Sequence, residues 1–479
     1  MNLPGLLNRL TFRHGKSHRR LNTIIDSLKT LLHSAFNQSA PIPEPGRSTR
    51  QPRLNRHVLP SRCNAMRSLF LLGISFIILA IRPAQASPDD KPVIAPTWIS
   101  RALGKPLVLT LTEPANFSHE HPTSVVIYLK NLAAPRLGTE SDETIIKDFL
   151  ASGYLVVELD FAHAPQARVP KINLDAGKLR DDIRSRQLLQ QYNVDNAHVY
   201  LVPAGHRILR DVIYYKDGGR ALGFDLIYPS KPAQPVGTVL EFSCDNKDRM
   251  GNTSLSICSD TLLDGEATEG YAVALADHPV AAPYKGIDPM PDCARKIKAA
   301  ARTLRATAHK LGLSEKIVPV GFSRGSGMAL MLVTTASRPE FEGYGETLGI
   351  DSAVQGAVVL SGRFSYLDLL PNDPMIPRYN AAWGERDKNL ATWREHGALD
   401  YLIAPTRPLF LSINCSESPD ALHQMEVLRK RLAVLGNDET FTMERVPRGH
   451  KVPLAPEILD AINRYLTQQL QPTASVSPK

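Results

Sequence analysis

Apolar and polar residues follow two distinct patterns along the second half of the chain. Short apolar runs of strand length alternate with stretches in which apolar residues recur every three or four positions, as in an amphipathic helix. Strands that alternate with helices predict an α/β fold with a mostly parallel sheet and helices on both faces. In chain order, the pattern predicts strands at 210–215, 221–228, 238–242 and 271–276, a helix at 292–311, a strand at 316–320, a helix at 326–334, strands at 357–360 and 408–413, a helix at 421–435, a strand at 440–446 and a helix at 456–470.

The preceding segment has a similar pattern, with an apolar run at 124–129, a helix-like stretch at 143–152 and a further apolar stretch at 153–160. Residues 153–160 (GYLVVELD) resemble residues 270–277 (GYAVALAD). Two interpretations stay open at this point. The N-terminal segment is either a partial duplicate of a strand-helix-strand unit or an unrelated α/β extension that shares only the patterning.

Composition and charge narrow the class of protein. Of the 479 residues, 43% are hydrophobic and 22% are charged, which excludes a disordered chain and a chain that is embedded in a membrane throughout. A net charge of +8 is typical of proteins that bind nucleic acid or anionic lipid. However, eleven Lys or Arg residues and only two acidic residues lie within 1–65. The rest of the chain is close to neutral, so we expect no nucleic-acid partner.

The residues after this basic stretch have the features of a secretory signal peptide at 66–86. A basic start is followed by the apolar run 69–81 and by small residues at 84 and 86, before a cleavage point. The run has 13 residues, fewer than the about 20 that a membrane-spanning helix needs. We therefore expect an exported protein, periplasmic or secreted, whose mature chain begins at Ser87 and has no stable membrane span.

These patterns predict a domain organisation. The basic leader 1–65 either precedes a translation start at Met66 or is an authentic long leader, and in both cases it is expected to lie outside the folded protein. The expected parts are the leader at 1–65, the signal peptide at 66–86, an N-terminal α/β extension at 87–195, a catalytic domain at 196–470 and a flexible tail at 471–479.

Four cysteines lie in the expected mature chain: Cys244, Cys258, Cys293 and Cys415. An even number in an exported protein permits disulfides, although the sequence does not choose among the pairings. Cys244 and Cys258 are close enough to pair across one loop, or they are plain buried thiols. None of the four stands in a CxxC pair, so we expect no structural zinc.

The most informative motif is Gly321-Phe322-Ser323-Arg324-Gly325, which lies between a predicted strand and a predicted helix. A GxSxG string in that setting is typical of a nucleophile elbow, in which a sharp turn holds the serine in a strained backbone conformation. The helix after the turn favours developing negative charge at its N-terminus. The pattern therefore predicts Ser323 as a nucleophile.

A serine hydroxyl needs a general base, and the base needs a carboxylate that orients it. His450 follows the predicted strand 440–446 and immediately precedes the last helix. Glu417 and Asp420 both follow the predicted strand 408–413, and the position of Glu417 is the more favourable of the two. We expect His450 as the base and Glu417 as the acid, with Asp420 as the alternative.

On these residues and on the order of the elements, the chain from about 210 to 470 resembles an α/β-hydrolase of the serine esterase and prolyl-oligopeptidase-like branches. The resemblance implies the chain order Ser, acid, His, with the acid after the seventh strand of the sheet and the histidine after the eighth. It also implies hydrolysis of esters or short peptides through an acyl-enzyme, without a cofactor.

Two parts of the expected site are less regular. Many relatives carry His-Gly after the third strand, where a backbone N–H completes the oxyanion hole, whereas Ser243 and Cys244 stand in that region here. Their backbone N–H groups, paired with that of Arg324, are the expected oxyanion donors. Trp383 and Trp393 lie in the insertion 371–401, where they either bind an acyl or sugar group of the substrate or pack between helices.

Together these observations predict an exported serine hydrolase that cleaves a carboxylic ester, with a small-molecule or oligomeric ester as its substrate. Two alternatives remain. A peptidase of prolyl-oligopeptidase type would use the same three residues, and a binding protein on the same fold would have lost the chemistry.

Overall fold

The structure is a computed structural model that describes residues 93–100, 105–130, 138–160, 169–185, 188–217, 220–242, 270–279, 290–437, 439–451 and 454–470. The chain divides into a unit of residues 1–81 and a unit of residues 82–479, and every described residue belongs to the second. The expected leader 1–65, the signal peptide 66–86 and the tail 471–479 lie outside the described residues.

The C-terminal sheet has eight strands in the order β13-β12-β11-β10-β8-β9-β7-β6. Only β7 runs against the others, since it is antiparallel to both β6 and β9 while every other neighbouring pair is parallel. The mostly parallel sheet that the sequence predicts is therefore confirmed. The strands are β6 (His206–Asp217), β7 (Arg220–Pro229), β8 (Thr238–Phe242), β9 (Ala272–Ala276), β10 (Ile317–Phe322), β11 (Ala357–Leu360), β12 (Leu409–Asn414) and β13 (Glu439–Glu444).

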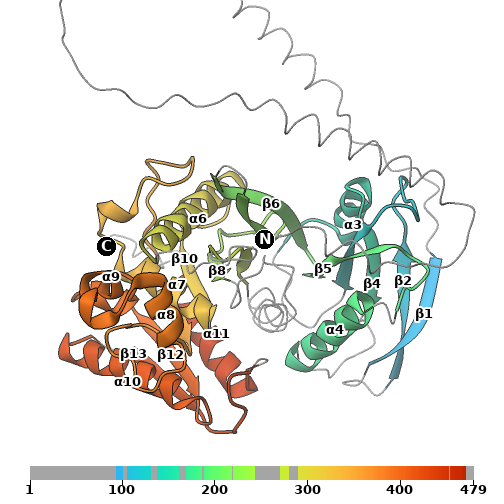
Figure 1. Ribbon diagram of the computed structural model, residues 1–479. Coiled ribbons are helices and arrows are strands. Elements are labelled where there is room, and N and C mark those ends of the chain that lie inside the picture. Colours follow the sequence, from blue (N-terminus) through green and yellow to red (C-terminus); the bar gives the residue numbers. More distant parts are fainter. Residues whose placement is uncertain are drawn as a thin grey trace, which may run out of the picture. The chain divides into compact units, whose positions relative to one another are not determined.

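Helices cover both faces of this sheet (Figure 1). The central strands are fully buried, as expected for parallel strands that are covered twice. Alternate residues of β10 divide between two cores: Ile317 packs with the helices of one face, whereas Val318 and Val320 pack with the closing helix on the other. The first face carries α6 (Met290–Lys310), α7 (Arg324–Thr334) and α10 (Pro419–Val434), and the second carries α11 (Pro456–Leu470).

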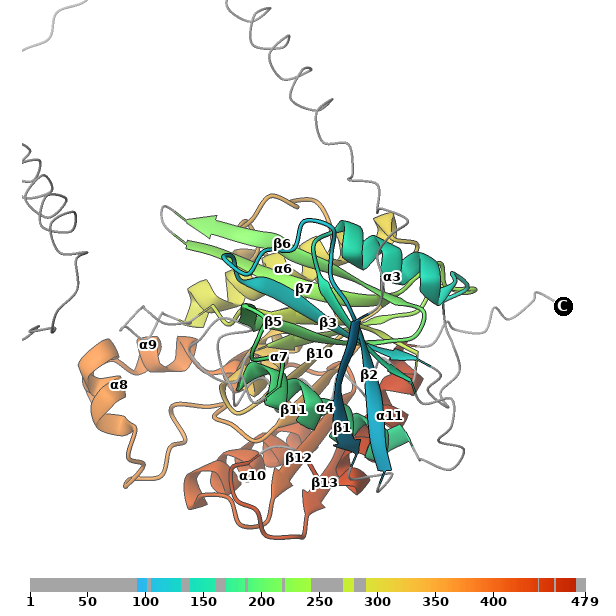
Figure 2. The ribbon, with the colours of Figure 1, turned by 90° about the vertical axis from the view of Figure 1, so that its right-hand side faces the viewer.

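The N-terminal sheet has five strands in the order β1-β2-β4-β3-β5, with β2 running against the others. Helices α3 and α4 lie on opposite sides of it (Figure 2) and each packs into its own apolar core. These elements are β1 (Val93–Ser100), β2 (Lys105–Thr112), β3 (Thr123–Lys130), α3 (Asp142–Ala151), β4 (Leu155–Asp160), α4 (Val169–Arg184) and β5 (Val194–Pro203).

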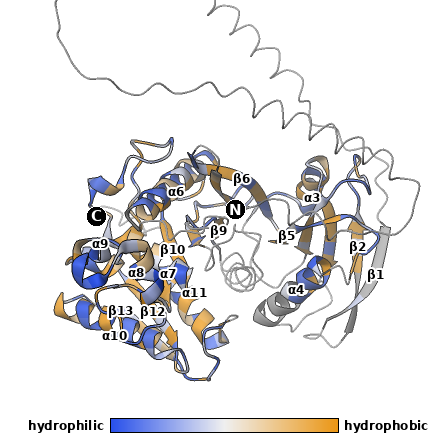
Figure 3. Ribbon diagram, viewed as in Figure 1, coloured by the Kyte–Doolittle hydropathy of each residue, from blue (hydrophilic) through white to orange (hydrophobic). Residues whose placement is uncertain are grey.

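Apolar residues concentrate where the strands and helices meet (Figure 3). In α11, for example, Ile458, Ile462, Tyr465 and Leu466 are buried against the sheet while the intervening residues are more exposed. This spacing is the helical period that the sequence displays. In the part of the chain that the structure describes, no helix is long and apolar enough to cross a membrane.

Most expected elements are confirmed, with small shifts at their ends. The helix expected from 326 begins at Arg324, directly after the turn that ends β10. The domain boundary expected between 195 and 196 falls inside β5, which pairs with β3 of the first sheet. The eight-stranded sheet therefore begins at His206, after only two connecting residues. Among the described residues, the strands β1, β2 and β5, the helix α4 and five short helices were not predicted. The short helices are η2 (Pro339–Phe341), α8 (Ile376–Trp383), η3 (Arg386–Lys388), α9 (Leu390–Glu395) and η4 (Ala398–Tyr401).

Candidate active site

Ser323 lies in a tight turn between β10 and α7. Its backbone has φ 56° and ψ −118°, a conformation that is unfavourable for a residue with a side chain. The turn brings the chain so close to itself that a Cβ on Gly321 would lie 2.1 Å from the carbonyl oxygen of Gly325. The first glycine of the motif is therefore a steric requirement, and the strained turn is the geometry expected of a nucleophile elbow.

The neighbouring strand β11 supports this turn. The backbone N–H of Ser323 donates to the carbonyl oxygen of Leu360, at 3.0 Å. Ser326 Oγ lies within hydrogen-bonding distance of the carbonyl oxygens of Ser323 and Ser361. A Cβ on Gly362 would lie 2.1 Å from Ser326 Oγ, so the residue after Ser361 must be small. The end of β11 thus holds the serine in place from one side.

Ser323, His450 and Glu417 form a continuous chain of contacts. His450 Nε2 lies 2.8 Å from Ser323 Oγ, and His450 Nδ1 lies 2.9 Å and 3.0 Å from the two carboxylate oxygens of Glu417. Because an ionised carboxylate only accepts hydrogen bonds, Nδ1 carries the proton. Nε2 is then an acceptor for the serine hydroxyl, which is the arrangement that a general base requires.

The three side chains differ in their exposure. The Glu417 side chain is 2% exposed and that of His450 is 46% exposed. The imidazole stacks on the ring of Phe322, with centroids 4.6 Å apart, so the residue before the serine also supports the base. Glu417 contacts the imidazole, whereas the alternative acid Asp420 lies in the first turn of α10.

A single amide side chain organises the loops that carry Glu417 and His450. Asn414, at the end of β12, accepts hydrogen bonds at Oδ1 from the backbone N–H of Ser416, Arg448 and Gly449, at 3.0–3.2 Å, and from Ser416 Oγ, at 2.8 Å. Its Nδ2 donates to the carbonyl oxygen of Val446 at 2.9 Å.

Further bonds bring the same two loops together. Ser416 Oγ also accepts from the N–H of Gly449 at 2.8 Å. The backbone N–H of Glu417 donates to the carbonyl oxygen of Asn414, at 3.1 Å. These bonds fix the loop before His450 against the loop that carries Glu417. Sequence reasoning missed Asn414, although an amide at the end of a buried strand is a detectable signal.

A cavity of about 490 Å³ opens beside Ser323. It contains the serine, the base and the acid, which the sequence predicted, together with two arginines and two tyrosines. Of these four, Arg324 was expected in the site, whereas Arg363 and Tyr366 were not. The lining residues are Ser323, Arg324, Gly327, Ser361, Gly362, Arg363, Tyr366, Met375, Tyr379, Glu417, Ser418, Ala421 and His450.

The two tryptophans expected to bind substrate are not among these lining residues. Trp393 is fully buried and donates from Nε1 to the carbonyl oxygen of Gly384, at 2.9 Å. Trp383 stacks on Tyr379 with centroids 4.7 Å apart. Their positions match the packing interpretation, because they form an aromatic core behind the tyrosines that line the cavity.

Other predicted residues fall partly outside the described regions. Arg324 begins α7 and lines the cavity, but the oxyanion donors Ser243 and Cys244 lie outside the described residues, as does Cys258. Cys293 is buried in α6, and Cys415 follows β12, where its thiol contacts the carbonyl oxygen of Arg445. Those two cysteines are not joined to each other.

No protein-family model matches the chain, and no curated protein matches it. Among solved structures, a truncated carbohydrate esterase from gut microbiota has 16% identity and a TM-score of 0.47, over 55% of this chain and 96% of that chain. A bifunctional GH43-CE protein of Bacteroides eggerthii has 19% identity and a TM-score of 0.46, over 55% of this chain and 38% of that chain. Esterase 2 of Thermogutta terrifontis, with propionate bound, has 18% identity and a TM-score of 0.45, over 56% of this chain and 97% of that chain. Likeness at this level does not assign the chain to a family.

Proposed function

We propose that residues 206–470 form an α/β-hydrolase domain that cleaves a carboxylic ester through an acyl-enzyme. The contacts from Ser323 Oγ to His450 Nε2 and from His450 Nδ1 to Glu417 carry this proposal. The order of the strands supports it as well. Counted from β6, the serine follows the fifth strand, Glu417 the seventh and His450 the eighth, which is the chain order of an α/β-hydrolase.

In the proposed reaction, Ser323 Oγ attacks the ester carbonyl carbon while His450 Nε2 takes the hydroxyl proton. Glu417 holds the imidazole in the tautomer that accepts this proton and stabilises the imidazolium that forms. Backbone N–H groups, with that of Arg324 as one donor, stabilise the negative oxygen of the tetrahedral intermediate. The intermediate collapses as His450 returns the proton to the leaving alcohol, and water then releases the acid by the same steps in reverse.

Hydrolysis of p-nitrophenyl butyrate and labelling by a fluorophosphonate probe test the proposal together. Both are expected in the wild type and both are expected to disappear in Ser323→Ala. Ser337→Ala, an exposed serine after α7, is the matched control and should keep both. Full activity of Ser323→Ala would overturn the proposal. Faster cleavage of peptide p-nitroanilides than of esters would favour a peptidase, and absence of labelling in the wild type would favour a binding protein.

Export is part of the proposal, and it rests on the segment 66–86. N-terminal sequencing of the protein recovered outside the cytoplasm is expected to begin at Ser87. A first residue upstream of Ser87 would contradict cleavage at that position.

A further inference from the structure

An ion pair between Arg363, which lines the cavity, and a buried carboxylate lies beside Ser323. Arg363 Nε donates to Asp373 Oδ2 and Arg363 Nη2 to Asp373 Oδ1, both at 3.0 Å. The Asp373 side chain is 0% exposed and that of Arg363 is 28% exposed. Asp373 Oδ1 also accepts from the backbone N–H of Met375 at 2.8 Å. The carboxylate is thus held in place, and it fixes one edge of the guanidinium.

Burying a carboxylate in this way adds little net stability, because the loss of hydration offsets most of the attraction. The pair does provide a fixed orientation for Arg363 beside the nucleophile. A guanidinium has five N–H donors, of which Asp373 engages two. The remaining donors are suited to a planar acceptor such as a carboxylate.

The surrounding groups favour the same kind of ligand. Arg324 lines the cavity directly after the nucleophile, and Tyr366 and Tyr379 line it with ring centroids 5.0 Å apart. Burial raises the pKa of both tyrosines, so both hydroxyls stay protonated and can donate. Among the described residues that line the cavity, Glu417 is the only carboxylate, and it contacts His450.

We propose that the cavity is specific for esters that carry a free carboxylate on the acyl or the alcohol side, which Arg363 binds with the help of Arg324. The specificity rests on the proposed ester hydrolysis and adds a substrate class to it. Arg363 is in this proposal a residue that determines specificity, and Asp373 is a positioning residue that acts through it.

Two matched pairs of esters test the specificity. On the acyl side, mono-p-nitrophenyl glutarate differs from p-nitrophenyl valerate by a carboxylate in place of a methyl group. On the alcohol side, 4-acetoxybenzoate differs from 4-acetoxybenzamide by its charge. In the wild type, kcat/KM is expected to be at least about tenfold higher for the anionic member of one pair, as for a hydrogen bond to a charged group.

The combined variant Arg363→Gln with Asp373→Asn removes the ion pair without leaving a lone buried carboxylate. This variant should reduce the ratio of anionic to neutral kcat/KM by about tenfold or more. Arg378→Gln, an exposed arginine of α8, is the control and should leave the ratio unchanged. If the combined variant does not fold, salt provides a second measurement. The wild-type ratio should decrease when NaCl is raised from 20 mM to 500 mM, because salt screens the attraction between the substrate carboxylate and the arginines.

A ratio near one in the wild type, or a ratio that the combined variant and salt both leave unchanged, would overturn the specificity while ester hydrolysis still stands. Failure of the proposed function itself looks different, because neither member of either pair would then be cleaved in a Ser323-dependent way.

A second inference comes from a separate observation: the two sheets share a strand order. The first sheet has the order β1-β2-β4-β3-β5, and the first five strands of the second sheet have the order β6-β7-β9-β8-β10. Counted along the chain, both orders are first, second, fourth, third, fifth. In both series only the second strand runs against the others. A helix joins the fourth and fifth strands in each, α4 in the first and α6 in the second. The two helices also pack on corresponding faces. α4 packs on the face that contains Leu155, the first residue of β4, and α6 packs on the face that contains Ala272, the first residue of β9.

The registers agree residue by residue. In the first sheet, Val125 pairs with Leu155 and Val199, and in the second, Thr238 pairs with Ala272 and Ile317. The correspondence continues in step for five levels, to Leu129, Leu159 and Pro203 in the first sheet and to Phe242, Ala276 and Gly321 in the second.

This register identifies the position that corresponds to the nucleophile. If Pro203 corresponds to Gly321, then Gly205 corresponds to Ser323, two residues further along. Both lie just after the fifth strand and both have positive φ, 78° for Gly205 and 56° for Ser323. The turn is thus similar, but the first sheet has no side chain there, and the chain enters β6 where α7 would begin.

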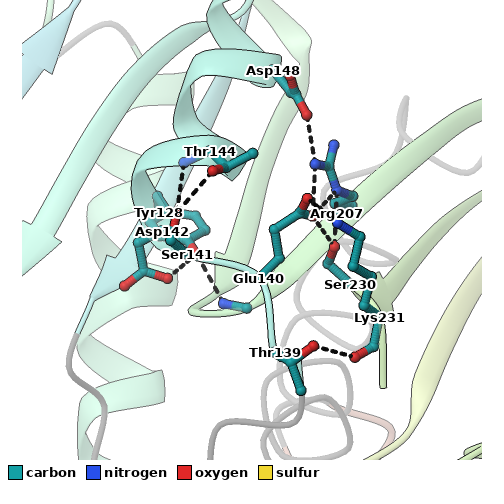
Figure 4. A network of polar contacts seen from close by, with 11 residues as sticks. Tyr128, Thr139, Glu140, Ser141, Asp142, Thr144, Asp148, Arg207, Ser230 and Lys231 are labelled. Atoms are coloured by element: carbon teal, nitrogen blue, oxygen red, sulfur yellow. Dashed lines mark hydrogen bonds and ion pairs between the residues drawn. The ribbon is translucent and has the colours of Figure 1, made fainter. Parts of the chain in front are cut away.

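The adjacent edge of the first sheet is filled by a polar network (Figure 4). Glu140 Oε2 accepts from Arg207 Nε at 2.9 Å and from Arg207 Nη2 at 2.7 Å, and also from Ser230 Oγ. Glu140 Oε1 accepts from Lys231 Nζ at 3.0 Å. Tyr128 OH accepts from the backbone N–H of Gly205 at 2.9 Å.

In open α/β sheets, ligands bind beyond the carboxyl ends of the parallel strands. In the first sheet, the network holds the first residues of β6 and the end of β7 at this edge, where a ligand would otherwise bind. We infer that residues 93–205 are an incomplete, inactive copy of residues 206–323, and that the edge which corresponds to its ligand site holds the first hairpin of the catalytic sheet.

The holding role is tested by hydrogen exchange on Glu140→Gln and Glu143→Gln in the full chain. Glu143 is an exposed neighbour in the first turn of α3 and serves as the control. Exchange at the start of β6 is expected to be at least about fivefold faster in Glu140→Gln alone, because the ion pair with Arg207 is lost. Equal protection in both variants would overturn this role. Fluorophosphonate labelling of any residue in 93–205, in the Ser323→Ala background, would overturn the inactive copy.

Discussion

The two sheets of this protein have the same arrangement of five strands and differ in the path of the chain after the fifth strand. Both have the order first, second, fourth, third, fifth, and both bury apolar residues on two faces beneath helices. After β10 the chain turns at Ser323 into α7 and adds β11, β12 and β13, whereas after β5 it turns at Gly205 and leaves the sheet.

The proposed chemistry requires more than the five strands that the two sheets share. Glu417, the proposed acid, follows β12 and His450, the proposed base, follows β13, so a sheet that stops at the fifth strand has no position for either residue. A nucleophile alone, without base and acid, would retain little activity. The comparison therefore predicts that corresponding changes in the two sheets have different consequences.

The largest difference is expected at the two turns. Ser323→Ala should reduce kcat for ester hydrolysis by about 10⁴-fold or more, as for loss of a nucleophile that acts with its base as a unit. Gly205→Ala should act on stability instead, with a loss of about 1 kcal/mol or more because alanine is strained at positive φ. Kinetics and denaturant unfolding of both variants measure the contrast. A loss of kcat in Gly205→Ala as large as that in Ser323→Ala would contradict the different roles assigned to the two turns.

A similar contrast is expected at two carboxylates, Glu417 and Glu140. Glu417→Gln should reduce kcat by about 10⁴-fold, as when the orienting acid of a triad is neutralised. Asp420→Asn, on α10, is the control for the alternative acid and should keep most of the activity. Glu140→Gln should instead lower the melting temperature. If Asp420→Asn were the variant that lost activity, the assignment of the acid would be wrong.

Asn414 should have an intermediate effect, since it positions both loops without touching the substrate. Asn414→Ala removes all its side-chain bonds, and we expect kcat to fall by about 10²-fold through displacement of His450. KM should change less than kcat. Asn437→Ala, which removes a single bond to the backbone of Thr406, is the control and should leave kcat unchanged. An unchanged kcat in a folded Asn414→Ala protein would contradict the positioning role.

The smallest effect concerns pH. The hydrogen bond from Ser230, with those from Lys231 and Arg207, lowers the pKa of Glu140 to about 2. A carboxylate with a lowered pKa stabilises the fold above its unfolded pKa and loses that contribution as the pH falls through the folded value. The melting-temperature difference between wild type and Glu140→Gln should therefore be constant from pH 7 to about 5 and shrink towards pH 2. A difference that does not change with pH would contradict an ionised Glu140.

Much of the fold was predictable because its signals are local. Buried strands such as β10 and β12 appear as apolar runs, and the elbow around Ser323 is a contiguous motif. His450 and Glu417 were found by their places after predicted strands. The choice between Glu417 and Asp420, three residues apart, depends on the path of one loop, and only the structure brings Glu417 to the imidazole.

Other features depend on contacts between distant residues, which no local pattern reports. Arg363 and Asp373 lie in an irregular segment, so their bidentate pairing and its place in the cavity were not visible. The strand order of the first sheet was also hidden. β1 and β2 precede the repeated GY pattern and pair with each other, and only β2 pairs with β4 across the chain. The apparent similarity of residues 153–160 and 270–277 was a trace of a larger correspondence in register.

The short connection between the sheets has a practical consequence for anyone who trims this protein. Only Ala204 and Gly205 separate β5 from β6, so there is no linker at which to cut. A truncation that begins at His206 would give β6 a free end and would strip Arg207 of the carboxylate of Glu140. β6 is also an edge strand of its sheet, and an edge strand whose end is released can pair with other molecules. The smallest soluble fragment with the catalytic residues is therefore expected to start near Val93, ahead of the first sheet.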